Sequence, residues 1–221
     1  MTFVTGSGHT GAVGSSAANV PGTGPRALAR GQLVEMRGAP IRYTISYLRS
    51  QFGDATYHRI VEATPPDVRT ALERDTFLST GWYPIVVLRD LQFTADRVCG
   101  DGSGALVSAL NAAQAEARLM EAKEALAAGP LAALGRLARE WRTDVRNGVY
   151  LDIADRRVGS FEIEFLVDSS LLQEGWLRHS ASAWFRRGAE LAGARDVQTQ
   201  DEVEVLTNEM RQLTLRILWQ A

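Results

Sequence analysis

GVYLDIADRRVGSFEIEFLV, residues 148–167, opens the part of the chain that decides the fold, Gly148 to Trp219. In its second half, apolar residues of one parity alternate with mostly polar ones: Phe161, Ile163, Phe165 and Val167. A period of two is the pattern of a half-buried strand. A shorter alternation precedes it from Val149 to Ile153, and we expect residues 154–157 to turn the chain between the two strands of a hairpin.

The apolar period then changes from two to three or four. Residues on one helical face recur from Leu177 to Leu191, and Gly193 stands where a left-handed C-terminal cap would lie. Two more alternating segments follow, at 197–205 and 213–219, with Asn208-Glu209 as the expected turn. The segment therefore predicts a strand-strand-helix-strand-strand unit built on a four-stranded antiparallel sheet.

Helical periods fill most of the chain between residues 40 and 145. Glycine and proline divide them at Gly53, Pro65-Pro66, Gly100–Gly104 and Gly129-Pro130. We expect Gly81–Pro84 to open one of the longer helices, and Gln32–Met36 to form a short strand or only a lead-in. Helices followed by hairpins predict an α+β fold in which N-terminal helices pack on the sheet.

Residues 1–30 are rich in Gly, Ser, Thr and Ala and contain no acidic residue. Within them, Gly6-Ser-Gly-His-Thr-Gly11 matches the dinucleotide-binding fingerprint letter for letter. That motif works between a strand and a helix, but only Thr2-Phe-Val4 precedes it, and the glycines and prolines that follow would not sustain a helix. We therefore expect a disordered tail at 1–30 and a single domain at 31–221.

Composition argues against several classes of protein. The net charge of -2 and the pI of about 6.0 disfavour a nucleic-acid-binding domain. No apolar run approaches the roughly 20 residues that span a bilayer. The single cysteine, Cys99, excludes an intramolecular disulfide and fits a reducing compartment, so we expect a cytoplasmic location. Lys123 is the only lysine among 24 basic residues, which indicates either recognition of phosphate or carboxylate groups or the codon bias of a GC-rich genome.

Catalytic and metal-binding motifs are absent from the sequence. The three histidines, His9, His58 and His179, form no His-Glu-x-x-His pair, and one cysteine cannot form a cluster. Glu162 and Glu164 share a strand face, but we expect this face to be solvated. The sequence therefore predicts no enzymatic activity, no metal and no cofactor.

Five tryptophans fall on elements that we expect to surround the sheet. An aromatic wall with a few polar groups is typical of a small-molecule pocket, and equally of an ordinary core or a dimer interface. Arginines beside Trp141 on the same helix offer a contact for an anionic ligand or a partner's carboxylate. If a pocket exists, the residues that we assign to it are Trp82, Tyr83, Trp141, Arg142, Tyr150 and Trp184.

The order of elements resembles the superfamily of 4-vinyl-reductase-like domains, heme-NO-binding domains and Bet-type subunits of Golgi transport particles. Within it, the chain is most similar to an uncharacterised paralogous family found mainly in myxobacteria. The residues that carry this likeness are Gly38, Phe52-Gly53, Pro65-Pro66, STGWYP at 79–84, LAGARDV at 191–197 and LRILW at 215–219. The similarity covers about residues 38–219.

The resemblance implies a dimeric sensor or adaptor domain, but two departures restrict what it implies about metals. Asp201–Met210 lacks the cysteines with which 4-vinyl-reductase-like relatives hold zinc near the last hairpin. Heme binders of the superfamily need an axial histidine and a Tyr-x-Ser-x-Arg clamp, whereas Tyr43-Thr-Ile-Ser46 has a different spacing. Neither zinc nor heme is carried over to this chain.

Two functions stay open. Our main expectation is a non-enzymatic adaptor domain, homodimeric and bound to a further protein partner within a larger assembly or signalling pathway, because no helix-turn-helix or kinase domain is present. The alternative is a sensor that binds a small apolar ligand in an aromatic-lined pocket between the helices and the sheet. A filled core beneath an exposed apolar patch would favour the adaptor, and a roomy cavity would favour the sensor.

Overall fold

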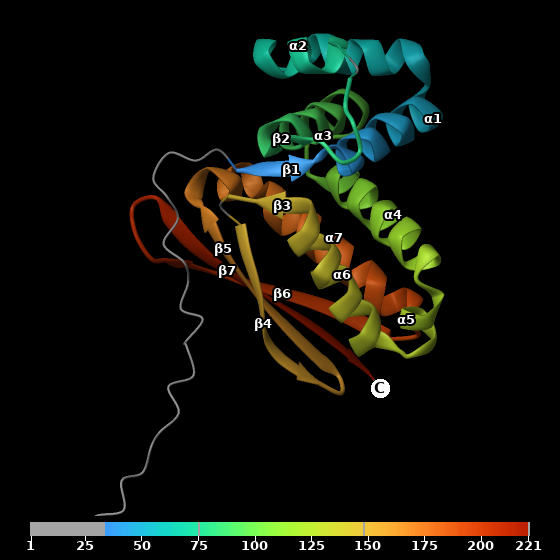
Figure 1. Ribbon diagram of the computed structural model, residues 1–221, viewed down its shortest axis with the longest axis vertical. Helices are drawn as coiled ribbons and strands as arrows, with labels where there is room; N and C mark the ends of the chain where they lie inside the picture. The colour runs from blue at the N-terminus through green and yellow to red at the C-terminus, as the bar shows by residue number, and fades with distance from the viewer. Residues whose placement is uncertain (1–33, 75, 148, 221) are drawn as a thin grey trace, which may run out of the picture.

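The computed structural model describes residues 34–220 except Asp75 and Gly148 (Figure 1). In order along the chain, the elements are β1 (Glu35–Arg37), α1 (Gly38–Ala63), α2 (Pro66–Arg74), β2 (Trp82–Pro84), α3 (Ile85–Cys99), α4 (Ala105–Glu121), α5 (Lys123–Ala127), α6 (Pro130–Asp144), β3 (Val145–Arg146), β4 (Val149–Arg157), β5 (Ser160–Asp168), the 3-10 helix η1 (Ser169–Gly175), α7 (Trp176–Leu191), β6 (Arg195–Val205) and β7 (Met210–Gln220). The α+β class predicted from the sequence is confirmed.

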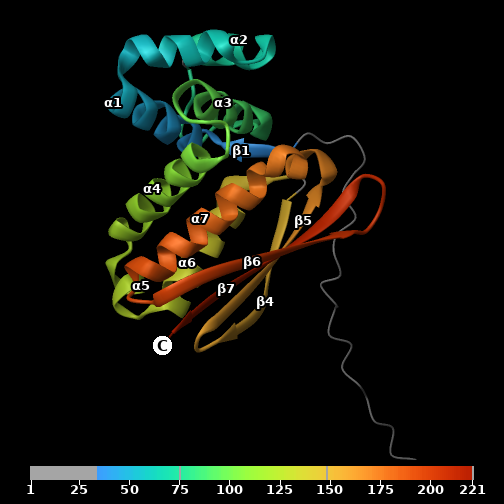
Figure 2. The same ribbon diagram turned by 180° about the vertical axis from the view of Figure 1, so that it is seen from behind.

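The C-terminal strands form the predicted four-stranded antiparallel sheet, in the order β4-β5-β7-β6. The four alternating residues of β5 that the sequence assigns to one face are all completely buried. Three of their four partners on β7 are buried with them: Leu213, Leu215 and Ile217. Helices α6 and α7 pack on this sheet, and α4 packs along α7 (Figures 1 and 2). Alternation with a period of two is therefore sufficient to identify both the strands and their buried face.

One predicted turn is wrong. Residues 154–157 continue β4 to its end, and the chain reverses at Val158-Gly159, where Gly159 has a φ of 82°. Glycine reaches positive φ without steric cost, so the reversal falls where the glycine is. A bulge between Ile153 and Asp155 shifts the register of β4 against β5, which hides the alternation on which the prediction relied.

Helix α1 is divided by Gly53, as the sequence predicts. Helical hydrogen bonding continues on both sides of the residue, but its φ of 77° and ψ of 162° are not helical, so the two halves meet at a kink. Helix α2 begins at the second of the two prolines, also as predicted. Together α1, α2 and α3 form an N-terminal helical lobe that stands apart from the four-stranded sheet (Figure 1).

A second sheet, of three very short strands in the order β2-β1-β3, joins this lobe to the rest of the molecule. Its presence corrects the expectation that Gly81–Pro84 opens a helix, because Trp82–Pro84 pairs with β1 and the helix starts only at Ile85. The residue before a proline avoids helical backbone angles, which holds Tyr83 in the extended conformation. Met36 at the centre of β1 pairs with Tyr83 on one side and with Val145 on the other.

The hairpin of β6 and β7 extends beyond the helices that cover the sheet, as both views show (Figures 1 and 2). Val203 pairs with Leu213 and therefore lies on the helix-covered face, which agrees with its predicted parity. It is nevertheless 41% exposed, and Val205 and Leu206 beyond it are 65% and 44% exposed.

Among the described helices, none combines the length and apolar character needed to cross a membrane.

Candidate ligand cavity

A small cavity lies where the three-stranded sheet, the helical lobe and the end of α6 meet. Its volume is about 30 Å³. A cavity of roughly 10–15 Å³ measured in this way holds one water molecule, so this one has room for about two. Residues from seven elements line it, among them Met36, Leu88, Gln114, Trp141, Trp176 and Trp184.

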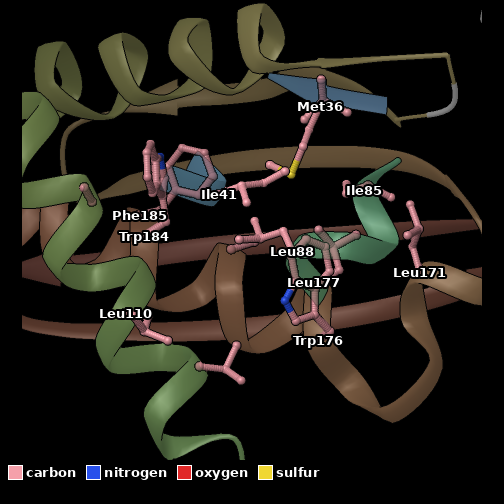
Figure 3. Packing of buried hydrophobic residues seen from close by; sticks show 14 of the residues in the cluster. Met36, Ile41, Ile85, Leu88, Leu110, Leu171, Trp176, Leu177, Trp184 and Phe185 are labelled. Carbon is pink, nitrogen blue, oxygen red and sulfur yellow. The ribbon is translucent and has the colours of Figure 1, made fainter. Parts of the chain in front are cut away.

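Met36 closes the cavity from the side of β1. The side chain extends from the strand toward Ile41 and Leu88, with its sulfur at the inner end (Figure 3). It is 5% exposed. An unbranched thioether with three rotatable bonds adapts to irregular space better than the branched side chains beside it.

Two of the three tryptophans at the cavity carry buried indole N–H groups that make no hydrogen bond within the described part of the structure: Trp141 and Trp184. The third, Trp176, is 1% exposed, and its indole N–H donates to the Gln92 side-chain oxygen at 2.9 Å. Buried donors in folded proteins almost always have a partner, and leaving one unpaired costs on the order of 1–3 kcal/mol. Two residues that line the cavity therefore carry indole donors whose hydrogen-bonding capacity is unused.

The aromatic rings behind the cavity are closely packed. The ring centroid of Trp141 lies 5.5 Å from that of Phe165 on β5 and 6.1 Å from that of Trp184, both edge to face. It also stacks with Phe185 at 6.5 Å. Such pairs contribute about 0.5–1.5 kcal/mol beyond their burial. They fill the space between α6, α7 and the four-stranded sheet, so the interior there is core rather than pocket.

A buried hydrogen-bond network adjoins the cavity and centres on Gln92 of α3, which is completely buried. Its side-chain oxygen accepts from Trp176 and, at 3.1 Å, from Asn111 of α4. Its side-chain nitrogen donates to the Thr44 hydroxyl of α1 at 3.2 Å. The network fixes the rings and amides at one side of the cavity, because each member is held by at least one partner.

Asp144, the last residue of α6, is the acidic group at the cavity. Its carboxylate accepts a hydrogen bond from Arg118 at 3.1 Å, and its side chain is 16% exposed. Burial raises the pKa of Asp144 above its ordinary value; Arg118 opposes this rise and the nearby Glu140 adds to it. The cavity thus has a carboxyl group that holds its proton more tightly than an exposed one.

Of the residues assigned to a pocket from the sequence, the structure places Trp141 and Trp184 at the cavity. Trp82 lies instead on the three-stranded sheet, where the guanidinium carbons of Arg37 and Arg146 are 4.2 and 4.3 Å from its ring centroid. Tyr83 ties down the loop before β2, since its hydroxyl accepts from the Leu78 backbone N–H at 2.8 Å.

Arg142 is also outside the cavity. It joins α6 to β4 by donating to the Leu151 carbonyl at 2.9 Å and to the Asp152 carboxylate at 3.1 Å. Tyr150 pairs through its backbone with Leu166, and its side chain lies outside the described part of the structure. The arginine beside the tryptophan stripe therefore holds two elements together.

Sequence reasoning missed Met36, Gln92, Asn111 and Asp144 as members or neighbours of this site. A weak signal existed for two of them, because Gln92 and Asn111 directly follow Leu91 and Leu110, which are apolar residues in the segment of helical periods between residues 40 and 145. A polar residue at the border of an apolar stripe is common, however, and only the packing of four helices shows that these two amides meet.

Comparison with known proteins gives a fold but no family. No family model and no curated protein matches the sequence. Solved H-NOX structures do match: a mutant of the unliganded Fe(II) protein of K. algicida has a TM-score of 0.57 and 12% identity over 84% of this chain and 97% of that one. An oxygen complex of an H-NOX domain related to soluble guanylate cyclases has a TM-score of 0.58 and 10% identity, over 84% of this chain and 96% of that one. A mutant of the H-NOX protein from T. tengcongensis has a TM-score of 0.56 and 9% identity, over 84% of this chain and 98% of that one.

At these identities the likeness establishes the fold alone. The expected relation to heme-NO-binding domains is therefore confirmed at the level of the fold, while the resemblance to one myxobacterial family stays a prediction. Another matched H-NOX structure is described in terms of heme distortion, so heme is the group whose fit must be tested here.

The described residues do not fit heme. The cavity of about 30 Å³ is far smaller than a porphyrin, and the aromatic rings of α6, α7 and β5 fill the space beside it. His58 is on the exposed side of α1, and His179 packs near Gly104 and Gly175, so neither histidine lines the cavity. No cluster of three metal-binding side chains occurs among the residues that the structure describes.

Proposed function

We propose that this protein is a heme-independent sensor domain whose inner cavity binds a compact, largely apolar molecule with one hydrogen-bond acceptor. The observation that carries the proposal is the pair of unpartnered indole N–H groups, of Trp141 and Trp184, at the same cavity. Matched structures with the same fold are described as binding oxygen or carrying heme. Their likeness supports a ligand-binding role over the adaptor role that we first favoured.

The small volume of the cavity limits the size of the molecule that it can bind. With room for about two water-sized groups, it must enlarge to take a larger molecule. Met36 is the side chain whose rotation would do this at least cost, because it is flexible and lies on a three-residue strand at the cavity wall. In this proposal the site enlarges as β1 and Met36 move.

Native mass spectrometry of the purified protein, compared with its denatured mass, tests the proposal. We expect an added small-molecule mass that disappears on denaturation. Trp184→Phe keeps the ring and removes the N–H, so it should weaken binding of that molecule about 2- to 10-fold, the effect of one hydrogen bond of about 0.5–1.5 kcal/mol. Trp219→Phe, on β7 away from the cavity, is the matched control.

A protein that carries no added mass, and whose Met36→Ala variant takes up neither benzene nor xenon, would contradict the proposal. Apolar cavities opened by truncation bind these two probes, so their exclusion would mean that the site cannot open. If Trp184→Phe and Trp219→Phe weakened binding equally, the indole donor would have no special role.

A second candidate is the homodimeric adaptor, and it rests on the exposed apolar end of the β6–β7 hairpin. Val203, Val205 and Leu206 together form a patch that folding leaves uncovered. Sedimentation equilibrium of the wild type and of Val205→Glu tests this role. A wild-type dimer that the substitution dissociates would support it, and a monomer at all concentrations would exclude self-association through this end.

A further inference from the structure

Helix α6 and strand β4 lie side by side, and together they carry five arginines (Figure 1). Three of the five form an ion pair with a carboxylate: Arg136 with Glu140, Arg142 with Asp152 at 3.1 Å, and Arg157 with Asp155 at 2.6 Å. The other two are Arg139 of α6 and Arg156 of β4. Among the residues that the structure describes, neither has a carboxylate partner or a hydrogen bond, and both side chains are exposed.

The guanidinium groups of Arg139 and Arg156 meet over Gly135 of α6. From the position that a Cβ of this glycine would have, the distance to Nη2 of Arg156 is 3.4 Å and that to Nη1 of Arg139 is 4.0 Å. The three heavy atoms nearest to that position, apart from the adjoining backbone, all belong to these two groups. Gly135 itself is buried. Because the glycine has no side chain, the surface of the helix leaves space into which both groups extend.

Two positive charges are thus brought together without a carboxylate to offset them, in a protein whose net charge is -2. Like charges at this separation repel each other, although water screens the repulsion between exposed groups. Each guanidinium also has five N–H donors in a planar fork, which matches the oxygens of a phosphate group. The donors of Arg139 and Arg156 are available to a ligand from solvent, whereas those of the three neighbouring arginines are partly occupied.

We propose that the pair of Arg139 and Arg156 binds a phosphate group, either inorganic phosphate or the terminal group of a phosphate monoester. A phosphate group carries nearly two negative charges and at least three acceptor oxygens, so a single group accepts from both guanidinium forks and offsets both charges. A carboxylate would offset only one of them. The site goes beyond the proposed sensor function and does not depend on it, because neither arginine lines the inner cavity.

Thermal unfolding of the full-length protein in sodium phosphate, compared with sodium chloride of equal ionic strength and pH, tests the site. A ligand that binds the folded state raises the melting temperature, but phosphate also stabilises proteins in general because it is excluded from their surface. We therefore expect a larger gain for the wild type than for Arg139→Gln or Arg156→Gln. Each substitution should weaken phosphate binding about 3- to 10-fold, less than the loss of a buried charged hydrogen bond, because both groups are exposed.

Arg157→Gln is the matched control, because this arginine is adjacent in the chain but already has Asp155 as its partner. It should keep the full gain in phosphate. If the wild type, Arg139→Gln, Arg156→Gln and the control all gain equally, the proposal is wrong. Circular dichroism establishes that each variant is folded before it is compared.

The stability of the variants in chloride alone separates binding from a structural role. At low ionic strength, Arg139→Gln and Arg156→Gln should be at least as stable as the wild type, because each removes a repulsion between like charges. Arginines that only support the fold would instead lose stability in both salts. Variants that are destabilised in chloride and still keep the gain in phosphate would overturn the proposal.

Isothermal titration with glycerol 2-phosphate separates the two sources of the phosphate group. Binding that is weakened in both variants extends the site to phosphate monoesters. Stabilisation by inorganic phosphate without binding of glycerol 2-phosphate assigns the site to inorganic phosphate, and the absence of both effects overturns the proposal. Trp184→Phe should change neither result, so the outcome is distinct from that of the inner cavity.

Discussion

Asp144 is the last residue of α6, and it lines the inner cavity. Burial raises its pKa, so the folded protein binds this proton more tightly than the unfolded chain does. Its contribution to stability is therefore present below the ordinary carboxyl pKa of about 3.9, and it is lost as the pH rises through the higher pKa of the folded state.

Asp144→Asn should remove this pH dependence. We expect the free energy of unfolding of the wild type, minus that of the variant, to fall as the pH rises from about 4 toward neutrality, as measured by urea denaturation. Glu73→Gln, at an exposed position on α2, serves as a control for the general effect of one lost carboxylate. Parallel stability curves for the wild type and Asp144→Asn would show that the folded protein does not shift this pKa.

At the residue scale, the sequence predicted Trp141 and Trp184 as neighbours in one site but not what distinguishes them from Trp176. All three are tryptophans on helices, and a periodic pattern assigns them the same apolar role. Their difference is the hydrogen bond that Trp176 donates to Gln92, on a helix more than 80 residues away in the chain. No local pattern encodes the presence or absence of such a partner.

At the scale of the element, Gly53 shows how one residue shapes a helix. A Cβ at this position would have nothing within 4 Å, yet the φ of 77° and ψ of 162° belong to a region that only glycine occupies readily. Gly53→Ala should therefore lower the free energy of unfolding by about 1–3 kcal/mol through backbone strain alone.

Gly135→Ala in α6 is the matched control for this substitution. Its backbone is helical, and a Cβ there would lie 3.4 Å from the end of the flexible Arg156 side chain. Alanine favours a helix over glycine by up to about 1 kcal/mol, so this variant should be neutral or slightly more stable in chemical denaturation. Equal melting temperatures for Gly53→Ala and the wild type would mean that the kink does not depend on glycine.

Long elements were predictable, whereas of the very short strands only β1 was anticipated, as one of two alternatives for Gln32–Met36. The strands β5 and β7 carry enough alternating residues to reveal their period, and glycine and proline mark the ends of most helices. The three-stranded sheet has strands of two or three residues, which are too short to show any period. Its pairing depends on the tertiary approach of β1 to segments far along the chain.

At the scale of the molecule, the Gln92 network joins the N-terminal lobe to the helices that cover the four-stranded sheet. Thr44, Asn111 and Trp176, which belong to three other helices, bond to it. Gln92→Leu would leave these groups without their partner, and we expect it to lower the free energy of unfolding by about 1–3 kcal/mol. Gln51→Leu, at an exposed site on α1, should change it by less than about 0.5 kcal/mol.

Urea denaturation followed by tryptophan fluorescence measures both variants. If Gln92→Leu were as stable as the wild type, the network would not contribute to stability, and the small sheet and apolar packing would be sufficient to hold the N-terminal lobe. The α+β class and the face of the sheet followed from the sequence, but this junction did not, because buried polar residues match no periodic template.

The pairing of β1 with β3 also determines the order of folding steps during synthesis of the chain. Glu35 and Arg146 lie 111 residues apart and are joined by a hydrogen bond of 2.7 Å. A ribosome that has released α1 to α5 has not yet supplied the second neighbour of β1, and bringing such distant segments together is slow because the loop must close first. One edge of β1 in the nascent N-terminal lobe therefore stays unpaired until α6 and the following strand β3 have been synthesised. Pairing of β3 with β1 then completes the small sheet.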